Sequence, residues 1–405
     1  MISDSLKNGA SFLLSGQIIQ VFVSFGSNLI LVRYLFPEDF GRFAMILAVA
    51  IIVLSIFSLN IRTMIIRTSS NLYSNSLKDV YFSVILYETI FSFLVLLLWL
   101  TVFETLDGWE ISLVIALSIR HWLNSNVSFF ERQMPFRELA LVETLSVVFG
   151  HSCALLMIFN GFGRETLFIR EVTLTLLGGL GLLFVNGITL RKLVPFWKIP
   201  WVNIFSQSRG LWLDTILESS FNRIVIISIY LLGGERAAGF FFQAQRLAGV
   251  PLQIFSPIFT RIAAVWFGRA EERWERKRGR NKLLYLSAVP LIFCGIVCFL
   301  IADDVVPFLF GENWLRSGQL LSLMAGVVVF HSLFEILKAY CWQTRQMRWL
   351  LIGRVSQYIG YGLPMILVVQ GILSGEVALA LGQSFAFFLS FMTVLLLLEN
   401  SERNW

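Results

Sequence analysis

The sequence predicts an all-α polytopic membrane protein, with about twelve transmembrane helices in two sets of six. Hydrophobic residues make up 57% of the 405 positions and charged residues only 14%, and the mean hydropathy is +0.75. A soluble domain carries about 25% charged residues. Apolar segments long enough to cross a hydrocarbon layer of about 30 Å also recur along the whole chain, joined by short connections. This pattern leaves no room for a soluble domain on either side of the membrane.

Each predicted span is a run of about 20 mostly apolar residues. The first six lie at about 10–34, 42–61, 80–103, 111–130, 139–159 and 167–190, and the second six at about 205–232, 237–262, 283–302, 318–341, 350–370 and 376–398. The even division, with the proline-containing segment LVPFWKIPW (Leu193–Trp201) between the two sets, predicts halves at residues 1–200 and 201–405.

The distribution of Lys and Arg predicts the orientation, because cytoplasmic loops carry an excess of both. With the N-terminus inside, the inner segments hold 22 of the 32 basic residues and the outer segments hold six, among them Arg164 and Arg170. We therefore expect both termini to be cytoplasmic, in a protein of the cell inner membrane. The basic run Arg269–Lys282 is interpreted as an inner loop beside anionic headgroups, and not as a nucleic-acid site.

A polar cluster, FPEDFG, interrupts the apolar sequence between the first two spans. Pro37 suits the first turn of a new helix, and Glu38 and Asp39 then lie where the helix dipole favours negative charge. Gly41 permits a tight turn or close packing. The cluster is therefore predicted to form an outer hairpin.

A similar cluster, LLGGERAAGFF, returns between the seventh and eighth spans, also on the outer side. Gly41 and Gly239 are 198 residues apart, close to half the chain. A similar cluster half a chain length later, on the same side of the membrane, predicts two parallel repeats of six helices.

Three segments carry a resemblance to a known family. They are GASFLLSGQIIQVF with LVRYLFPEDFGRFA near the N-terminus, Asn222–Ile262, and VVPFLFGENWLRSGQLLSLMA (Val305–Ala325). In order and spacing they resemble the polysaccharide-transporter (Wzx-type flippase) family of the multidrug/oligosaccharidyl-lipid/polysaccharide exporter superfamily. The resemblance covers both halves of the chain and implies two six-helix bundles around a central cavity. One departure is that members often carry Asp-Arg where this chain has Asn222 and Arg223.

The resemblance implies a flippase that moves a polyprenyl-diphosphate-linked oligosaccharide across the cytoplasmic membrane for surface polysaccharide (O-antigen, lipopolysaccharide, capsule or exopolysaccharide) biosynthesis. Alternating access would be coupled to a gradient of Na⁺ or H⁺, with other polysaccharide-assembly membrane proteins as partners. An ion-coupled exporter of organic cations in the same superfamily is the alternative.

Charged side chains at membrane depth are costly, so they usually pair or face an aqueous cavity. Four cations are candidates for binding the diphosphate by charge-assisted contacts: Arg120, Arg223, Arg246 and Lys338. Four carboxylates are candidates for ion coupling: Glu88, Asp214, Glu218 and Glu335. The structural alternative is that these groups form salt bridges between helices, for instance Glu88 with Arg120 and Glu335 with Lys338.

Neutral polar side chains at helical spacing suggest a hydrated path, or alternatively hydrogen bonds between helices. The candidates for the cavity lining are Gln17, Gln20, Asn28, Asn124, Gln243, Gln253 and Gln357. Pro251 is expected to kink the eighth span, in which Gln243, Arg246 and Gln253 share a face.

A membrane glycan polymerase or ligase is a third interpretation. Such enzymes commonly present a large external loop with arginines or histidines, and neither that loop nor a nucleophile–base pair is readable here. We therefore expect no enzymatic activity. Neither a cofactor nor a metal site is predicted, since the four cysteines lie in apolar runs without metal-ligand spacing.

Overall fold

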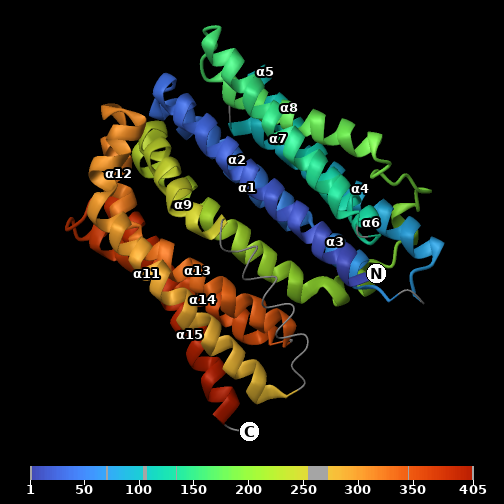
Figure 1. Cartoon of the computed structure of the whole chain (residues 1–405). Coiled ribbons are helices and arrows are strands. Elements are labelled where there is room, and N and C mark those ends of the chain that lie inside the picture. Colours follow the sequence, from blue (N-terminus) through green and yellow to red (C-terminus); the bar gives the residue numbers. More distant parts are fainter. Residues whose placement is uncertain are drawn as a thin grey trace. The chain divides into compact units, whose positions relative to one another are not determined.

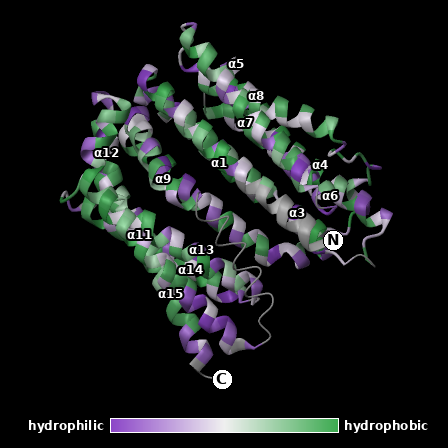
Figure 2. Ribbon diagram, viewed as in Figure 1, coloured by the Kyte–Doolittle hydropathy of each residue, from purple (hydrophilic) through white to green (hydrophobic). Residues whose placement is uncertain are grey.

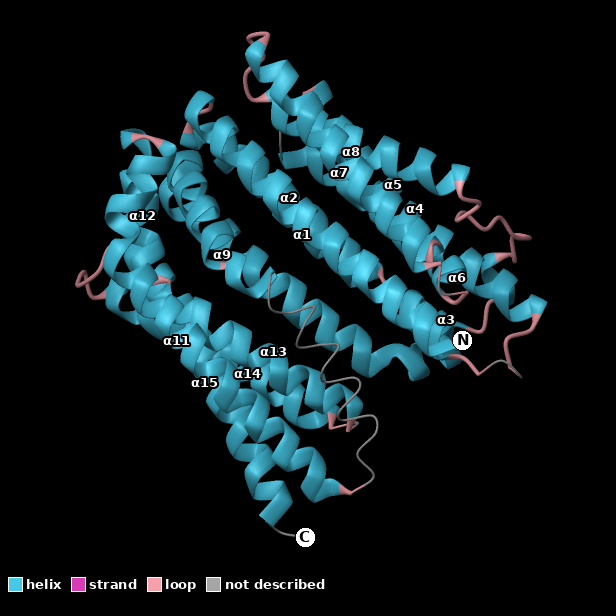
Figure 3. Cartoon of the chain, viewed as in Figure 1, coloured by secondary structure: helices cyan, strands magenta, loops and turns pink. Residues whose placement is uncertain are grey.

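The computed structural model describes residues 2–69, 72–103, 107–133, 135–253, 272–344 and 346–403. Regular structure in these residues is helical, without a strand (Figures 1 and 3). In the first half of the chain the α-helices are α1 (Ile2–Tyr34), α2 (Pro37–Phe57), α3 (Ile61–Arg67), α4 (Asn75–Phe103), α5 (Gly108–Asn126), α6 (Ser128–Glu131), α7 (Phe136–Phe159) and α8 (Glu165–Phe184). The later α-helices are α9 (Trp201–Ala248), α11 (Arg273–Phe310), α12 (Leu315–Leu323), α13 (Ala325–Gln343), α14 (Met347–Val369) and α15 (Gly375–Arg403). Two 3₁₀ turns are η1 (Phe196–Lys198) and η2 (Glu312–Trp314).

The chain divides into two compact units. Unit 1 comprises Met1–Leu35 and Ile46–Ser220, and unit 2 comprises Phe36–Met45 and Phe221–Trp405. In unit 1, α7 packs against α1 and α8, and α5 against α4 and α8. In unit 2, α15 packs against α13 and α14, and α11 against α12 and α13. That each unit is one six-helix repeat stays a prediction.

The polytopic all-α fold predicted from the sequence is confirmed. Nine of the described helices are long and apolar enough to cross a membrane. One of them, α9, contains the predicted seventh span and the start of the eighth, and α5 and α14 cover two further predicted spans. The predicted tenth span is divided at Met324 between α12 and α13. The end of the eighth span (254–262) lies outside the described residues.

Apolar side chains cover much of the helix surface, which is the arrangement that a hydrocarbon solvent requires (Figure 2). On α11, Tyr285, Leu286, Val289 and Phe293 are 77%, 64%, 73% and 66% exposed. In water such a surface would be an aggregation hazard. In a bilayer it is the face that contacts acyl chains.

The two polar clusters noted in the sequence pack against each other in unit 2. Helix α2 begins at Pro37, as predicted, and α9 bends at Gly234, whose φ of 74° suits glycine. The residues of α9 that follow this bend lie against the start of α2. A Cβ atom added to Gly41 would lie 1.8 Å from the Glu235 carbonyl oxygen, and one added to Gly239 would lie 1.8 Å from the Pro37 carbonyl oxygen. Each glycine therefore admits the backbone of the other cluster.

Candidate functional site

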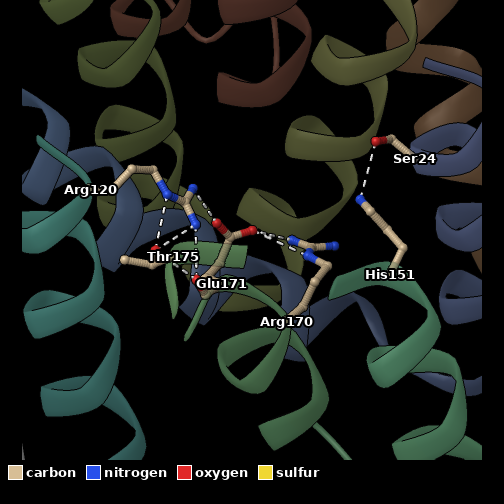
Figure 4. Close-up of polar contacts among 6 residues, drawn as sticks. All are labelled: Ser24, Arg120, His151, Arg170, Glu171 and Thr175. Carbon is tan, nitrogen blue, oxygen red and sulfur yellow. Dashed lines mark hydrogen bonds and ion pairs between the residues drawn. The ribbon is translucent and has the colours of Figure 1, made fainter. Parts of the chain in front are cut away.

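A buried charged cluster connects α5 and α8 within unit 1. The two carboxylate oxygens of Glu171 are divided between two arginines, which lie on opposite sides of it (Figure 4). Arg120 Nη1 donates to Glu171 Oε2 at 2.7 Å, while Arg170 Nε and Nη2 donate to Oε1 at 3.2 and 3.0 Å. Arg120 Nε also donates to the Thr175 hydroxyl at 3.1 Å. Two guanidinium groups thus share one carboxylate, and the cluster carries a net charge of +1.

Exposure differs among the three charged side chains. Arg120 is 30% exposed, whereas Arg170 and Glu171 are 7% and 11% exposed. Arg120 is therefore the member that an incoming anion would meet first. Its other contact, from Nη2 to the Glu171 carbonyl oxygen at 2.9 Å, fixes the guanidinium on α8.

This cluster bears on two inferences from the sequence. The pair of Glu88 with Arg120, given as an example of the structural alternative, is wrong, because the turn of α8 that carries Glu171 and Thr175 faces α5 and Arg120 pairs with Glu171. Arg170, counted from the sequence among the outer basic residues, lies near the start of α8, where it is buried beside Glu171. The available signal was the adjacent Arg-Glu pair inside the apolar run LFIREVTLTLL, where two opposite charges side by side indicate a buried pair.

The polar residues of α1 contact α7. Ser24 shares a hydrogen bond with His151 Nε2 at 3.1 Å (Figure 4), and Gln20 Nε2 donates to the Thr144 hydroxyl at 3.2 Å. Asn28 is buried and Gln17 is exposed. For Gln20 the structure therefore favours the second interpretation of the polar residues, hydrogen bonding between helices.

Glu88 lies at a break between α2 and α3. The helix ends at Phe57 and restarts at Ile61, and Asn60 between them has a left-handed φ of 59°. The Leu59 backbone N–H donates to Glu88 Oε1 at 2.8 Å, and the Trp212 indole N–H donates to the Ile56 carbonyl at 2.9 Å. Both bonds satisfy backbone groups that the break removes from the helix.

The carboxylate of Glu88 has no cationic partner among the described residues. Its side chain is 4% exposed, and its second oxygen, Oε2, accepts no hydrogen bond from that part of the chain. An ionised carboxylate is costly to bury without a positively charged partner. A bound proton or a small cation would remove that cost for Glu88.

Another predicted cation, Arg223, lies in unit 2. It lies on α9, is partly buried, and has neither a hydrogen-bond nor an ion-pair partner among the described residues. Its neighbour Asn222 accepts a hydrogen bond from Gln383 Nε2 at 3.2 Å, and Phe221 packs edge-on against Tyr358 and Phe387. The residues of α9 just before Arg223 are thus packed against α14 and α15, while the guanidinium keeps its donors.

Two other predicted residues of unit 2 make salt bridges or hydrogen bonds along their own helix. Lys338 pairs with Glu335 at 3.0 Å, as their spacing suggested. Gln357 is fully buried and accepts a hydrogen bond from Arg354 at 3.4 Å. Arg354 also lies over the Phe334 ring at 4.7 Å.

The remaining predicted residues differ in burial and in element. Asp214 and Gln243 are buried in α9, Glu218 and Arg246 are partly buried in it, and Asn124 is exposed on α5. Helix α9 ends at Ala248, before Pro251, so the exposed Gln253 lies beyond the helix that carries Gln243 and Arg246. Helical residues resume at Val250 after a turn at Gly249, so the common face of these three residues stays a prediction. That Arg120, Arg223 and Arg246 converge on one cavity stays a prediction.

A family model for polysaccharide biosynthesis proteins matches residues 30–319, which is more than half of the chain. The chain belongs to this polysaccharide biosynthesis protein family. A comparison with curated protein sequences finds no match. The family model therefore confirms the predicted membership of a polysaccharide biosynthesis family.

Solved structures with the same fold are membrane transporters and flippases. The lipid II flippase MurJ in an inward closed conformation has a TM-score of 0.71 at 12% identity, over 96% of this chain and 86% of that chain. An inward-facing multidrug resistance MATE family transporter of the MOP superfamily has a TM-score of 0.64 at 15% identity, over 96% and 97%. A point mutant of the Vibrio cholerae MATE transporter VcmN has a TM-score of 0.64 at 12% identity, over 99% of both chains. At these identities the likeness concerns the fold.

Proposed function

We propose that this chain is a flippase that translocates a polyprenyl-diphosphate-linked oligosaccharide across the cytoplasmic membrane during surface polysaccharide biosynthesis. The observation that carries the proposal is Arg223, a partly buried guanidinium without a partner in the described chain. A diphosphate would provide the acceptors that this arginine lacks, through bidentate charge-assisted hydrogen bonds. The family's role in polysaccharide biosynthesis supports a glycan cargo. In unit 1, the net charge of +1 around Arg120 would also attract an anion.

The test is Arg223→Ala in proteoliposomes loaded with a fluorescent polyprenyl-diphosphate sugar. A lost charge-assisted contact amounts to about 1.5–3 kcal/mol, so we expect translocation to fall by roughly tenfold or more. The matched control is Arg164→Ala, which removes an arginine from an exposed pair with Asp107 and should leave translocation unchanged. Normal translocation by Arg223→Ala, at equal protein level, would remove the proposed role of this residue.

The second candidate function is export of organic cations. It is favoured by Glu88, a buried carboxylate without a cationic partner in the described residues, and by the MATE transporters that share the fold. Drug susceptibility of a deletion strain distinguishes the two functions. A flippase deletion should lose surface glycan at unchanged drug susceptibility, and the opposite pattern would favour the exporter.

Glu88 is also the best-supported site of ion coupling among the four predicted carboxylates, since Glu335 already pairs with Lys338. We expect Glu88→Gln to retain substrate exchange, because the amide oxygen can still accept from the Leu59 N–H. It should abolish the acceleration of transport by a proton gradient, because an amide takes up no proton. Glu88→Asp, which still titrates, should keep part of that acceleration, and Glu138→Gln on the exposed first turn of α7 is the control. A full gradient response in Glu88→Gln would place the coupling elsewhere.

A further inference from the structure

The end of unit 2 that the basic residues predict to be cytoplasmic contains a cavity that the proposed transport does not use. It has a volume of about 750 Å³ and lies between the first turns of α11, the ends of α13 and α15, and the start of α14. Its lining includes Trp274, Arg276, Lys277, Gln346 and Trp349. A cavity of this size falls in the range of ligand-binding pockets.

A second cavity of about 580 Å³ adjoins the first, because both are lined by Trp274 and Lys277. It extends along α11 past Arg278 and Lys282 to Tyr285 and Leu286. These last two side chains are 77% and 64% exposed on the face that contacts acyl chains. The two adjoining cavities therefore extend from the end of unit 2 to the hydrocarbon-facing surface of α11.

Side chains around the first cavity are fixed by an ion-pair network. Arg280 is fully buried and donates to Glu399 and, at 3.1 Å, to Glu402. Lys277 pairs with Glu399 at 2.9 Å and with Glu402 at 3.4 Å. The Tyr340 hydroxyl donates to Glu402 at 2.7 Å. The network joins α11 and α13 to α15 and holds Lys277 at the boundary of both cavities.

The lining of the two cavities is strongly cationic. Among the described residues, four basic side chains (Arg276, Lys277, Arg278 and Lys282) and one carboxylate, that of Glu402, line them. Figure 2 shows hydrophilic residues gathered at the end of α15, with the mostly apolar length of α11 beyond its first turns. Since α11 rises about 1.5 Å per residue, Lys277 lies about 12 Å before Tyr285, which places its ammonium near the headgroup layer.

We propose that the two cavities form a binding site for an anionic phospholipid of the inner leaflet. The headgroup phosphate occupies the cationic chamber near Lys277 and Arg276, Trp274 and Trp349 lie at the interface as amphipathic side chains do, and the acyl chains follow Tyr285 and Leu286. Basic pockets between transmembrane helices on the cytoplasmic side bind such headgroups. The proposal is independent of the translocated substrate.

The test uses the full-length protein in detergent and native mass spectrometry, with phosphatidylglycerol and phosphatidylcholine as the two probes. We expect one phosphatidylglycerol to be retained with a dissociation constant about tenfold or more below that of phosphatidylcholine. Arg276→Gln with Lys277→Gln should abolish this preference. Arg191→Gln with Lys192→Gln, which removes the same charge from another predicted inner segment, should keep it.

A cavity-filling variant separates lipid binding from damage to the ion-pair network. Ser401 lines the first cavity and donates only to the Leu398 carbonyl among the described residues. Ser401→Phe should therefore exclude the lipid while all the cations remain. Equal retention of both lipids by the native protein would overturn the proposal. So would an unchanged preference for phosphatidylglycerol in both the Arg276→Gln, Lys277→Gln variant and the Ser401→Phe variant. Displacement of the lipid by an equal concentration of glycerol phosphate would also overturn it, since the site would then recognise free phosphate.

Discussion

Replacing Glu171 by glutamine is expected to lower the free energy of unfolding by about 3–5 kcal/mol, which is the usual cost of breaking a buried ion pair from one side. Both arginines would keep their charge but lose the negative charge between them, and one would face the amide NH2 in place of the carboxylate oxygen that it now contacts at about 3 Å. Arg170, at 7% exposure, should account for most of the loss, while Arg120, at 30%, recovers part of its hydration. The measurement is the apparent melting temperature of the full-length protein in detergent.

A triple replacement distinguishes a structural from a functional role of this cluster. Arg120→Met, Arg170→Met and Glu171→Leu together remove every charge, and apolar replacement of buried ion pairs is often neutral or stabilising. We therefore expect a melting temperature near that of the native protein. If Arg120 also contacts the diphosphate, this stable variant should translocate the substrate more slowly than the native protein. Native translocation by the triple variant would reduce the cluster to a purely structural element.

Local features of the fold were predictable because they depend on neighbouring residues. Runs of apolar residues predicted the spans, Pro37 marked the start of α2, and the three-residue spacing of Glu335 and Lys338 predicted their pair. Each of these inferences uses only helix periodicity or backbone chemistry.

Contacts between distant helices were not predictable in the same way. Arg120 and Glu171 are 51 positions apart, and Leu59 and Glu88 are 29 apart. Helix periodicity gives the face on which a residue lies, but not which helix packs against that face. This is why the sequence could not distinguish Glu88 from Glu171 as the partner of Arg120 in the structural alternative. The break before Asn60 also left no composition signal, since the segment IFSLNIRTM has neither proline nor glycine.

The two similar clusters that contain Gly41 and Gly239 give the second large prediction, which concerns the stability of the protein. The sequence indicated two similar hairpins, and within unit 2 the structure brings these segments into direct backbone contact. Around them, Arg236 pairs with Glu38 at 3.5 Å, and Arg42 donates to the Tyr230 hydroxyl at 3.3 Å. The glycines permit the approach that these polar contacts require.

Gly41→Ala and Gly239→Ala are each expected to destabilise the protein by about 3 kcal/mol, the upper end of the range for overpacking. The added methyl group would meet a carbonyl oxygen at 1.8 Å, and a backbone atom cannot move aside as a side-chain end can. The control is Gly362→Ala on α14, where nothing lies within 4 Å and alanine favours the helix by about 0.5–1 kcal/mol. Melting temperatures should therefore fall for the first two variants and stay level or rise for the third. Equal melting temperatures of the three variants would mean that the two segments are not in contact in the membrane. The similarity of the two clusters would then reflect only the turn residues that hairpins share.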